Sequence, residues 1–185
     1  ANGSTLTITI GNGTITTFSG IISGSGNLGK TGRGTFILDQ ANTYSGNTYV
    51  YDGTLEISGR LGAGSYAGLI SIANTKTLTI SSSSNQVLSG IISGLGSIVK
   101  SGTGTLTLSA MNTYSGGTTV NAGTLFGGAG SRSNTTFGSG DITVASGATL
   151  WIDRTEDGVM TNTLNLNGGT LQGTNGFGEY WDGSI

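Results

Sequence analysis

The chain repeats itself at a nearly fixed period, and this periodicity restricts its fold more than any other feature of the sequence. A shift of 70 residues aligns residues 18–57 with residues 88–127, with 22 identical residues in 40 aligned positions. Beyond the loop at residues 58–67 the shift becomes 72, and residues 68–80 then align with residues 140–152. Self-similarity at a fixed period indicates a repeat architecture. We therefore expect structural units of one kind, stacked on one another.

A shorter element recurs within the long repeat: a threonine, an apolar residue, any residue, and a second apolar residue. It begins at Thr5, Thr35, Thr54, Thr77, Thr105, Thr149 and Thr163. Alternation of apolar and polar residues predicts a strand with one buried face. We expect these apolar side chains to be buried: Leu6, Leu38, Leu55, Leu78, Ile80, Leu106, Leu108, Leu125 and Leu150. The variable position faces solvent: Thr7, Ile37, Glu56, Thr79, Thr107, Trp151 and Asn165.

The composition favours short strands joined by tight turns. Glycine accounts for 36 of the 185 residues and charged residues for 9%, against usual shares of about 7% and 25%. No window has the 3.6-residue spacing of an amphipathic helix, and no run of about 18 apolar residues predicts a transmembrane helix. Proline, which cannot donate a hydrogen bond within a β-sheet, is absent. The sequence therefore predicts an all-β fold with negligible helix.

The second copy of the repeat carries a long motif between residues 94 and 125. Its fixed positions are Gly94, Gly96, Lys100, Gly102, Gly104, Thr105, Leu106, Leu108, Asn112, Thr113, Tyr114, Gly116, Thr118, Val120, Gly123, Thr124 and Leu125. These residues resemble the autotransporter-associated β-strand repeat, also called the passenger-associated transport repeat, with Ile98 in place of a leucine. The first copy departs from the pattern at Phe36. The resemblance implies an elongated right-handed parallel β-helix, a β-solenoid, and coils of roughly 20 residues would give about eight coils in a stack of roughly 40 Å.

The same resemblance implies a function. It implies that residues 1–185 are a single β-helix segment cut from a longer passenger, with repeat units at about 18–87 and 88–180. Such a segment is a non-catalytic, adhesin-like structural stalk, secreted or displayed on the bacterial surface and often linked to virulence. Its parent chain carries an outer-membrane β-barrel translocator, and its folding outside the cell aids secretion. Because the ends of the segment resemble interior sequence, end-to-end self-association is also expected.

Two other functions remain open. The chain could be an adhesive module that binds a glycan or protein of a host or neighbouring cell, or a polysaccharide-cleaving β-helix enzyme. Aromatic side chains on predicted strands are the candidate ligand contacts, because exposed rings can stack on sugars: Tyr49, Tyr51 and Trp151. Packing between coils is the structural alternative for these rings. An ice-binding face is disfavoured, since the outward position of the short element varies.

We predict no catalytic, cofactor-binding or metal-binding residues. The chain has no histidine or cysteine, which excludes imidazole bases and thiolate chemistry. The acidic cluster of Asp153, Glu156 and Asp157 with Arg154 lacks calcium-loop spacing, and we interpret it as a solvated loop. The glycine pattern at residues 24–29 precedes no helix, so it is a turn rather than a dinucleotide site. A net charge of −2 gives no reason to expect nucleic acid as a partner.

Two further features recur in both copies and are interpreted as structural. The sequence Asn-Thr-Tyr-Ser-Gly at residues 42–46 and 112–116 predicts a corner, in which stacked asparagine amides satisfy inward-turned backbone groups and the tyrosine covers the turn. Lys30 and Lys100 share the apolar face but end their strands. We expect them to reach solvent or to bind turn carbonyl groups.

Overall fold

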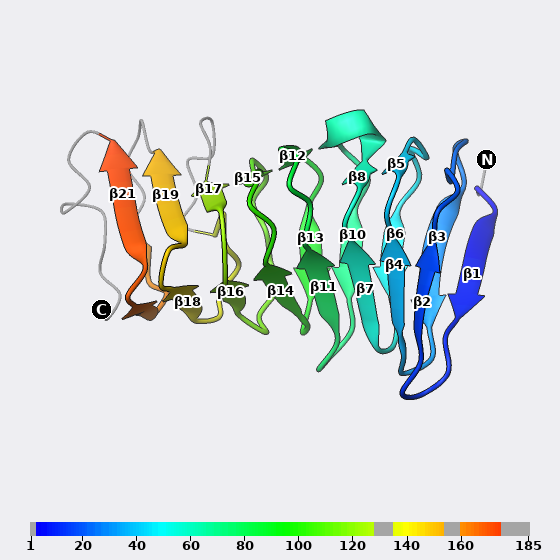
Figure 1. Cartoon of the computed structure of the whole chain (residues 1–185), viewed down its shortest axis with the longest axis horizontal. Coiled ribbons are helices and arrows are strands. Elements are labelled where there is room, and N and C mark those ends of the chain that lie inside the picture. The colour runs from blue at the N-terminus through cyan, green and yellow to red at the C-terminus, as the bar shows by residue number, and fades with distance from the viewer. Residues whose placement is uncertain (1–2, 128–134, 154–159, 175–185) are drawn as a thin grey trace.

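The chain winds into a parallel β-solenoid with three flat faces. The structure is a computed structural model that describes residues 3–127, 135–153 and 160–174. Figure 1 shows the strands stacked side by side along the long axis, from β1 at one end to β21 at the other. Every pairing between the named strands is parallel. The expected all-β solenoid is therefore confirmed.

Each face is one sheet, to which successive turns contribute one strand each. The first sheet contains β1 (Thr5–Thr9), β3 (Asn27–Thr31), β6 (Thr48–Val50), β10 (Ile70–Ile72) and β13 (Ile92–Gly94). The second sheet contains β2 (Ile15–Phe18), β4 (Thr35–Leu38), β7 (Thr54–Ile57), β11 (Thr77–Ile80), β14 (Ser97–Lys100), β16 (Thr118–Val120), β18 (Ile142–Ala145) and β20 (Leu164–Asn167). The third sheet contains β9 (Ser65–Tyr66), β12 (Gln86–Leu88), β15 (Thr105–Leu108), β17 (Thr124–Gly127), β19 (Thr149–Asp153) and β21 (Thr170–Thr174).

Three short elements complete the described chain. The strands β5 (Ala41–Asn42) and β8 (Arg60–Leu61) pair with each other, and the 3₁₀ turn η1 (Gly62–Gly64) protrudes from the stack after β8 (Figure 1). No helix in the described ranges is long and apolar enough to cross a membrane.

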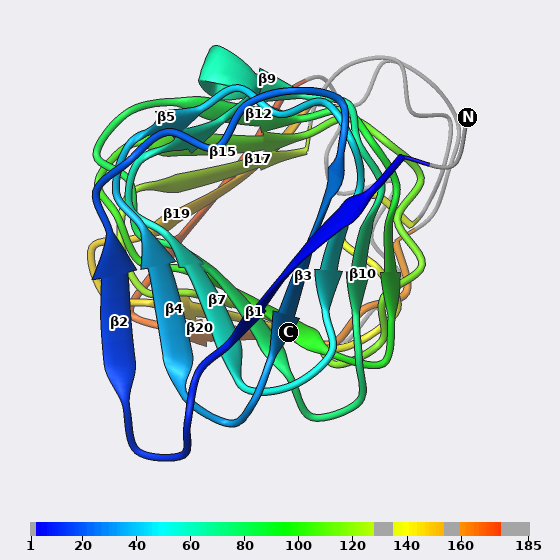
Figure 2. The ribbon, with the colours of Figure 1, turned by 90° about the vertical axis from the view of Figure 1, so that its right-hand side faces the viewer.

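The solenoid is right-handed and has about the expected number of coils. In Figure 2 the N-terminal end faces the viewer, and the chain turns clockwise as it recedes, up through β2 and β4 and down through β3 and β10. The second sheet holds eight strands, one for each level, so the stack spans about seven full turns. The expected number of about eight coils is therefore close to the observed one, which is about seven full turns over eight levels.

A continuous apolar column fills the interior. Along the second sheet, parallel register places Leu55 beside Leu78 and Leu78 beside Ile98, and all three are fully buried. The expected core residues Leu38, Leu55, Leu78, Ile80, Leu106, Leu108, Leu125 and Leu150 are all buried. Full burial of one such side chain contributes about 1.5–3 kcal/mol, so several per coil offset the entropy lost on ordering the chain.

Leu6 was wrongly expected to be buried. It lies on β1, the first strand of the first sheet, and 47% of its surface is exposed. Its register partner Leu28 is fully buried, because β3 has neighbours on both sides whereas β1 has one. An apolar residue in a solenoid is thus covered only where a coil lies on each side of it.

The long sequence repeat does not contain a whole number of turns. The first motif copy places β3 and β4 on the first and second sheets. Their sequence equivalents β14 and β15 lie on the second and third sheets. From β3 the chain makes three turns, through β6, β10 and β13, and then advances by one more face. Equivalent residues of the two copies therefore point in different directions around the axis.

The buried column predicts a clear difference between inward and outward positions of one strand. Leu106→Ala should lower the free energy of unfolding by about 2–5 kcal/mol, because it deletes part of a fully buried side chain. Thr107→Ala, at the adjacent outward position, should change it by less than about 0.5 kcal/mol. Chemical denaturation of both variants measures the difference. Equal losses for the two would contradict the assignment of faces.

Candidate binding surface

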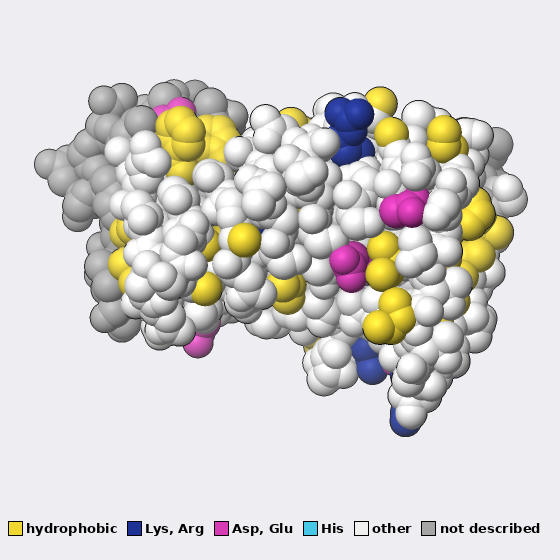
Figure 3. Space-filling view, in the orientation of Figure 1, with side chains coloured by type: hydrophobic (Ala, Val, Ile, Leu, Met, Phe, Trp, Pro, Cys, Tyr) yellow, Lys and Arg dark blue, Asp and Glu magenta, His cyan; other side chains and the backbone are white. Residues whose placement is uncertain are grey.

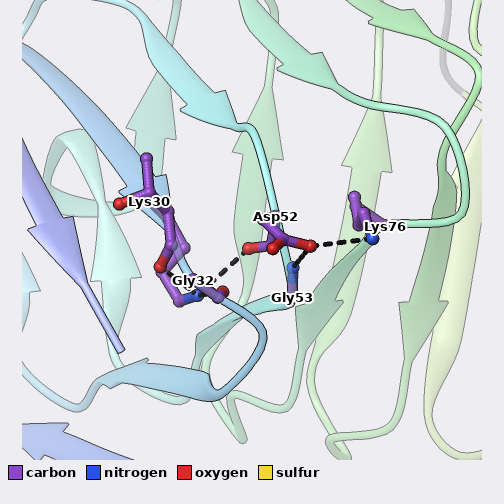
Figure 4. Close-up of polar contacts among 6 residues, drawn as sticks. Lys30, Gly32, Asp52, Gly53 and Lys76 are labelled. Carbon is purple, nitrogen blue, oxygen red and sulfur yellow. Dashed lines mark hydrogen bonds and ion pairs between the residues drawn. The ribbon is translucent and has the colours of Figure 1, made fainter. Parts of the chain in front are cut away.

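The two recurring lysines are buried and bind the backbone carbonyl groups of turns. The Lys30 ammonium donates to the carbonyl oxygens of Thr31 at 2.9 Å, Gly32 at 2.6 Å and Asp52 at 3.0 Å (Figure 4). Lys100 does the same with the carbonyl groups of Gly102 and Ala122. Both side chains are 1% exposed or less, so they do not reach solvent. Each lysine instead holds its own turn against the turn of the next coil.

The turn beyond each lysine requires glycine. Gly53 has φ +68° and Gly123 has φ +66°, in the left-handed region that other residues rarely adopt. A Cβ atom at Gly53 would lie 2.3 Å from the carbonyl oxygen of Gly34 in the preceding coil. These glycines let successive turns stack closely enough for the lysine to span them.

Burial determines the acid–base behaviour of these lysines. Desolvation lowers the pKa of Lys100 from 10.5 to about 8. It also lowers the pKa of Lys30, and the nearby Asp52 carboxylate opposes this shift. Carbonyl groups accept from all three donors of the Lys30 ammonium and from two donors of the Lys100 ammonium. Turn carbonyl groups surround the lysine in both copies, and neither lysine reaches solvent. Both lysines therefore have a structural role.

Buried asparagines join the corners of adjacent coils. The Asn112 side-chain oxygen accepts a hydrogen bond from the Ile92 N–H at 2.8 Å, and its amide donates to the Thr136 carbonyl at 2.6 Å. Asn42 accepts from the Ile22 N–H and donates to the Gln40 carbonyl in the equivalent corner. The two asparagines lie three turns apart and are not stacked on each other. Each asparagine binds inward-turned backbone groups on its own, without a second asparagine above or below it, and so links adjacent coils.

The corner tyrosines point into the protein rather than over it. Tyr44 and Tyr114 are 1% exposed or less, and their hydroxyl groups lie 2.7 Å and 2.6 Å from the Thr48 and Thr118 hydroxyls. Burial raises the pKa of both tyrosines. We expected each tyrosine to cover its corner. The ring is instead a core residue, because the threonine four positions later supplies the partner that a buried phenol requires.

Two of the three candidate aromatic residues form a pair on the first sheet. Tyr49 lies on the outward side of β6, and Tyr51 follows the strand. Their ring centroids are 5.6 Å apart and the ring planes differ by 8°. Tyr49 is half-buried, whereas 52% of Tyr51 is exposed. The rings therefore form one nearly parallel aromatic surface that solvent can reach.

Trp151 does not join this pair. It lies on β19 of the third sheet, where its ring packs against Phe126 of the neighbouring β17 with centroids 4.9 Å apart. Its indole N–H is buried, and no partner is found for it among the described residues. Trp151 thus fits the alternative of packing between coils.

An ion pair lies next to the tyrosine pair. The Asp52 carboxylate is 2.7 Å from the Lys76 ammonium, and it also accepts a hydrogen bond from the Gly53 N–H at 2.9 Å (Figure 4). The bond to Lys76 is the main reason that the pKa of Asp52 is lowered, and Arg33 contributes to the shift through its charge. Figure 3 shows that charged side chains are sparse and scattered over the face it presents. Asp52, Lys76 and Arg33 thus form a small group of charges at the turns that follow the first sheet.

Among the described residues, the remaining carboxylates do not gather into a metal-binding cluster. The described residues contain no group of three or more acidic, histidine or cysteine side chains placed to hold a metal ion. Of the acidic cluster considered from the sequence, Asp153 ends β19, whereas Arg154, Glu156 and Asp157 lie outside the described residues. Asp39 accepts a hydrogen bond from Ser19, and Glu56 accepts one from Ser81.

Comparison with known proteins identifies the repeat. The profile of the passenger-associated-transport repeat matches residues 28–57 and 98–125, which are the two segments that contain the buried lysine, asparagine and tyrosine. Two segments of the chain are thus similar to the passenger-associated-transport repeat. It is also 38% identical, over 144 aligned residues, to the adhesin BmaC autotransporter of Brucella suis biovar 1 (strain 1330). That alignment covers 60% of this chain and 4% of the adhesin. No solved structure matches the chain.

The chain thus spans only a small part of the length of the autotransporter adhesin that it matches. Within the two segments that match the passenger-associated-transport repeat, residues that recur are largely inward or in turns, such as Lys30 and Lys100 or Tyr44 and Tyr114. Several outward positions differ between the copies, and the tyrosine pair occurs in the first copy alone. Sequence reasoning identified both tyrosines but not their association with Asp52 and Lys76, since Lys76 belongs to the next coil.

The Lys100 environment predicts a pH dependence of stability. Between about pH 8 and pH 10.5 the unfolded chain holds a lysine proton that the folded chain has released, so stability should rise with pH. The free energy of unfolding of the wild type, minus that of Lys100→Met, should increase between pH 7 and pH 9.5. Above about pH 10 the buried tyrosines oppose the trend. There the unfolded chain releases its tyrosine protons while the folded chain keeps them, so stability falls as the pH rises. A difference that stays constant to pH 9.5 would contradict the assigned environment.

Asn112 provides a second stability prediction. Asn112→Ala leaves the Ile92 N–H and the Thr136 carbonyl without their partner, and each unsatisfied buried group costs about 1–3 kcal/mol. Asn121→Ala is the matched control, because Asn121 is exposed and should change stability by less than about 0.5 kcal/mol. Denaturant titration distinguishes them. Comparable stability of the two variants would show that the corner asparagine is dispensable.

Proposed function

We propose that this chain is a non-catalytic structural segment of an autotransporter passenger, which acts as a rigid stalk. The observation that carries this proposal is the location of the residues that recur between the two copies. The lysines, asparagines and tyrosines that both copies share are buried; the lysines and asparagines join one coil to the next, and each tyrosine bonds to a threonine of its own coil. Many of the residues that differ face outward, whereas buried positions that differ, such as Leu28 and Ile98, exchange one apolar side chain for another. A sequence that keeps coil-to-coil contacts constant and leaves its surface free to vary is suited to extending a solenoid.

The relative's assignment as an autotransporter adhesin supports a location outside the cell. We infer that the parent chain has an outer-membrane β-barrel translocator and that this segment is exposed on the cell surface or secreted. Each coil buries apolar side chains against its predecessor, so stability grows coil by coil. Folding of coils that have emerged from the pore would then hinder their return and aid export of the remaining chain.

Surface display tests this role. The segment is placed between a signal peptide and a translocator barrel, and external protease then reports how much passenger reaches the cell surface. Leu106→Ala should reduce the amount displayed several-fold, because it weakens the docking of its coil. Thr107→Ala, which alters the outward side of the same strand, should leave display unchanged.

Equal display of both variants would contradict a contribution of folding to export. The total amount of passenger in whole-cell lysates serves as the control for expression. The role as a stalk is tested separately, because it requires only that the wild-type segment be folded and protease-resistant on the surface.

A further inference from the structure

The tyrosine pair is held in place by the residues around it. Gly29, opposite Tyr49 on the neighbouring strand, has no side chain, and a Cβ atom there would lie 3.2 Å from the Tyr51 ring. The Tyr51 ring therefore lies over the backbone of β3 and covers Gly29, which is buried. On the other side, the Asn47 amide donates to the Tyr49 hydroxyl at 3.3 Å. Asn47 is itself held by hydrogen bonds to the coils on both sides.

The strands beside the pair leave the rings accessible. Parallel register places Ser71 beside Tyr49 on one side, with Ser93 next to Ser71. On the other side Gly29 is followed by Thr7. All of these outward residues are small, so none rises above the rings. The first sheet thus presents a flat surface with one aromatic pair, bordered by hydroxyl groups.

The charged group next to the pair supplies directional hydrogen bonds. Asp52 follows Tyr51 directly in the chain and pairs with Lys76, with the charge of Arg33 nearby. All three belong to turns between the first and second sheets. A molecule that stacks on Tyr51 would therefore meet carboxylate oxygens and cationic N–H groups at one edge. Together the site has an apolar face and a polar rim.

The second copy shows that the scaffold does not require this arrangement. Thr119 and Asn121 occupy the positions equivalent to the two tyrosines, and Ala122 replaces Asp52. Val99 replaces Gly29, so the space for the ring and the ring itself are lost together. The strand β16 nevertheless keeps the same three-residue pattern of burial as β6. A coil of this kind can therefore form without the pair, although Tyr51 covers Gly29 in the first copy.

We propose that Tyr49 and Tyr51 form a binding platform for a pyranose ring of a glycan. The C–H face of the sugar stacks on the tyrosine rings, and its hydroxyl groups hydrogen-bond to Asp52 and Lys76. A protein partner is disfavoured because stable interfaces bury about 800 Å² on each side, with an apolar core. Here two rings are surrounded by serine, threonine and charged residues. This binding role adds to the structural role proposed above and does not depend on it.

Titration with defined tetrasaccharides tests the proposal. The panel contains a neutral, an N-acetylated and a carboxylated example: cellotetraose, chitotetraose and tetragalacturonate. Backbone amide NMR shifts of the 185-residue chain identify the site, and calorimetry gives the affinity. At least one sugar should bind with shifts centred on β6 and the turn after it. Preference between the neutral and carboxylated members shows whether the Arg33 and Lys76 charges select an acidic sugar.

Three variants locate the binding. Tyr49→Thr combined with Tyr51→Asn introduces the residues of the second copy and should weaken binding at least about tenfold, with the melting temperature retained. Gly29→Val keeps both rings but displaces Tyr51, and it should also weaken binding. Thr119→Ala combined with Asn121→Ala is the matched control and should bind as the wild type. Binding of none of the three sugars, or binding that survives the double tyrosine replacement, would overturn the proposal.

Discussion

Each coil of this protein has polar groups that only its neighbours can satisfy. A parallel coil turns three corners, and at each corner backbone groups face the interior or the next coil. Lys30, Asn112 and Tyr114 illustrate the solution, because each reaches a partner in its own turn or in an adjacent coil. An unpaired buried group would cost as much as the burial of a leucine contributes. The corners therefore limit the sequence as strictly as the apolar column does.

This constraint explains why the repeat can advance by one face between copies. The contacts of the motif are local: a strand, its turn, and the same features one coil away. All three faces offer that environment, so β4 on the second sheet and β15 on the third are formed by equivalent sequences. A motif with a fixed place on one face would need a period that is a whole number of turns. As a result, outward residues of successive copies are distributed around the solenoid.

The sequence alone was sufficient to predict the inward leucines, because alternation defines the two sides of a strand whichever face it belongs to. It also placed Lys100 against turn carbonyl groups. It could not show that Leu6 would be exposed, since burial depends on a coil at each side. Nor could it show that Tyr44 faces inward, because the partner hydroxyl of Thr48 belongs to the following strand. The pairing of Lys76 with Asp52 follows from coil length, which varies from turn to turn.

The exposed tyrosines have a structural role in addition to the binding role proposed above. Glycine on a strand leaves its backbone open to water and packs poorly against its neighbours. Tyr51 covers Gly29 and in this way restores part of the lost packing, while one side of the ring system stays open to solvent. The second copy achieves the same cover with Val99 and needs no aromatic ring there. Tyr51 over Gly29 and Val99 thus meet the same packing requirement, but only the first places an aromatic ring on the surface. A solenoid can in this way acquire a binding surface without a change in its core.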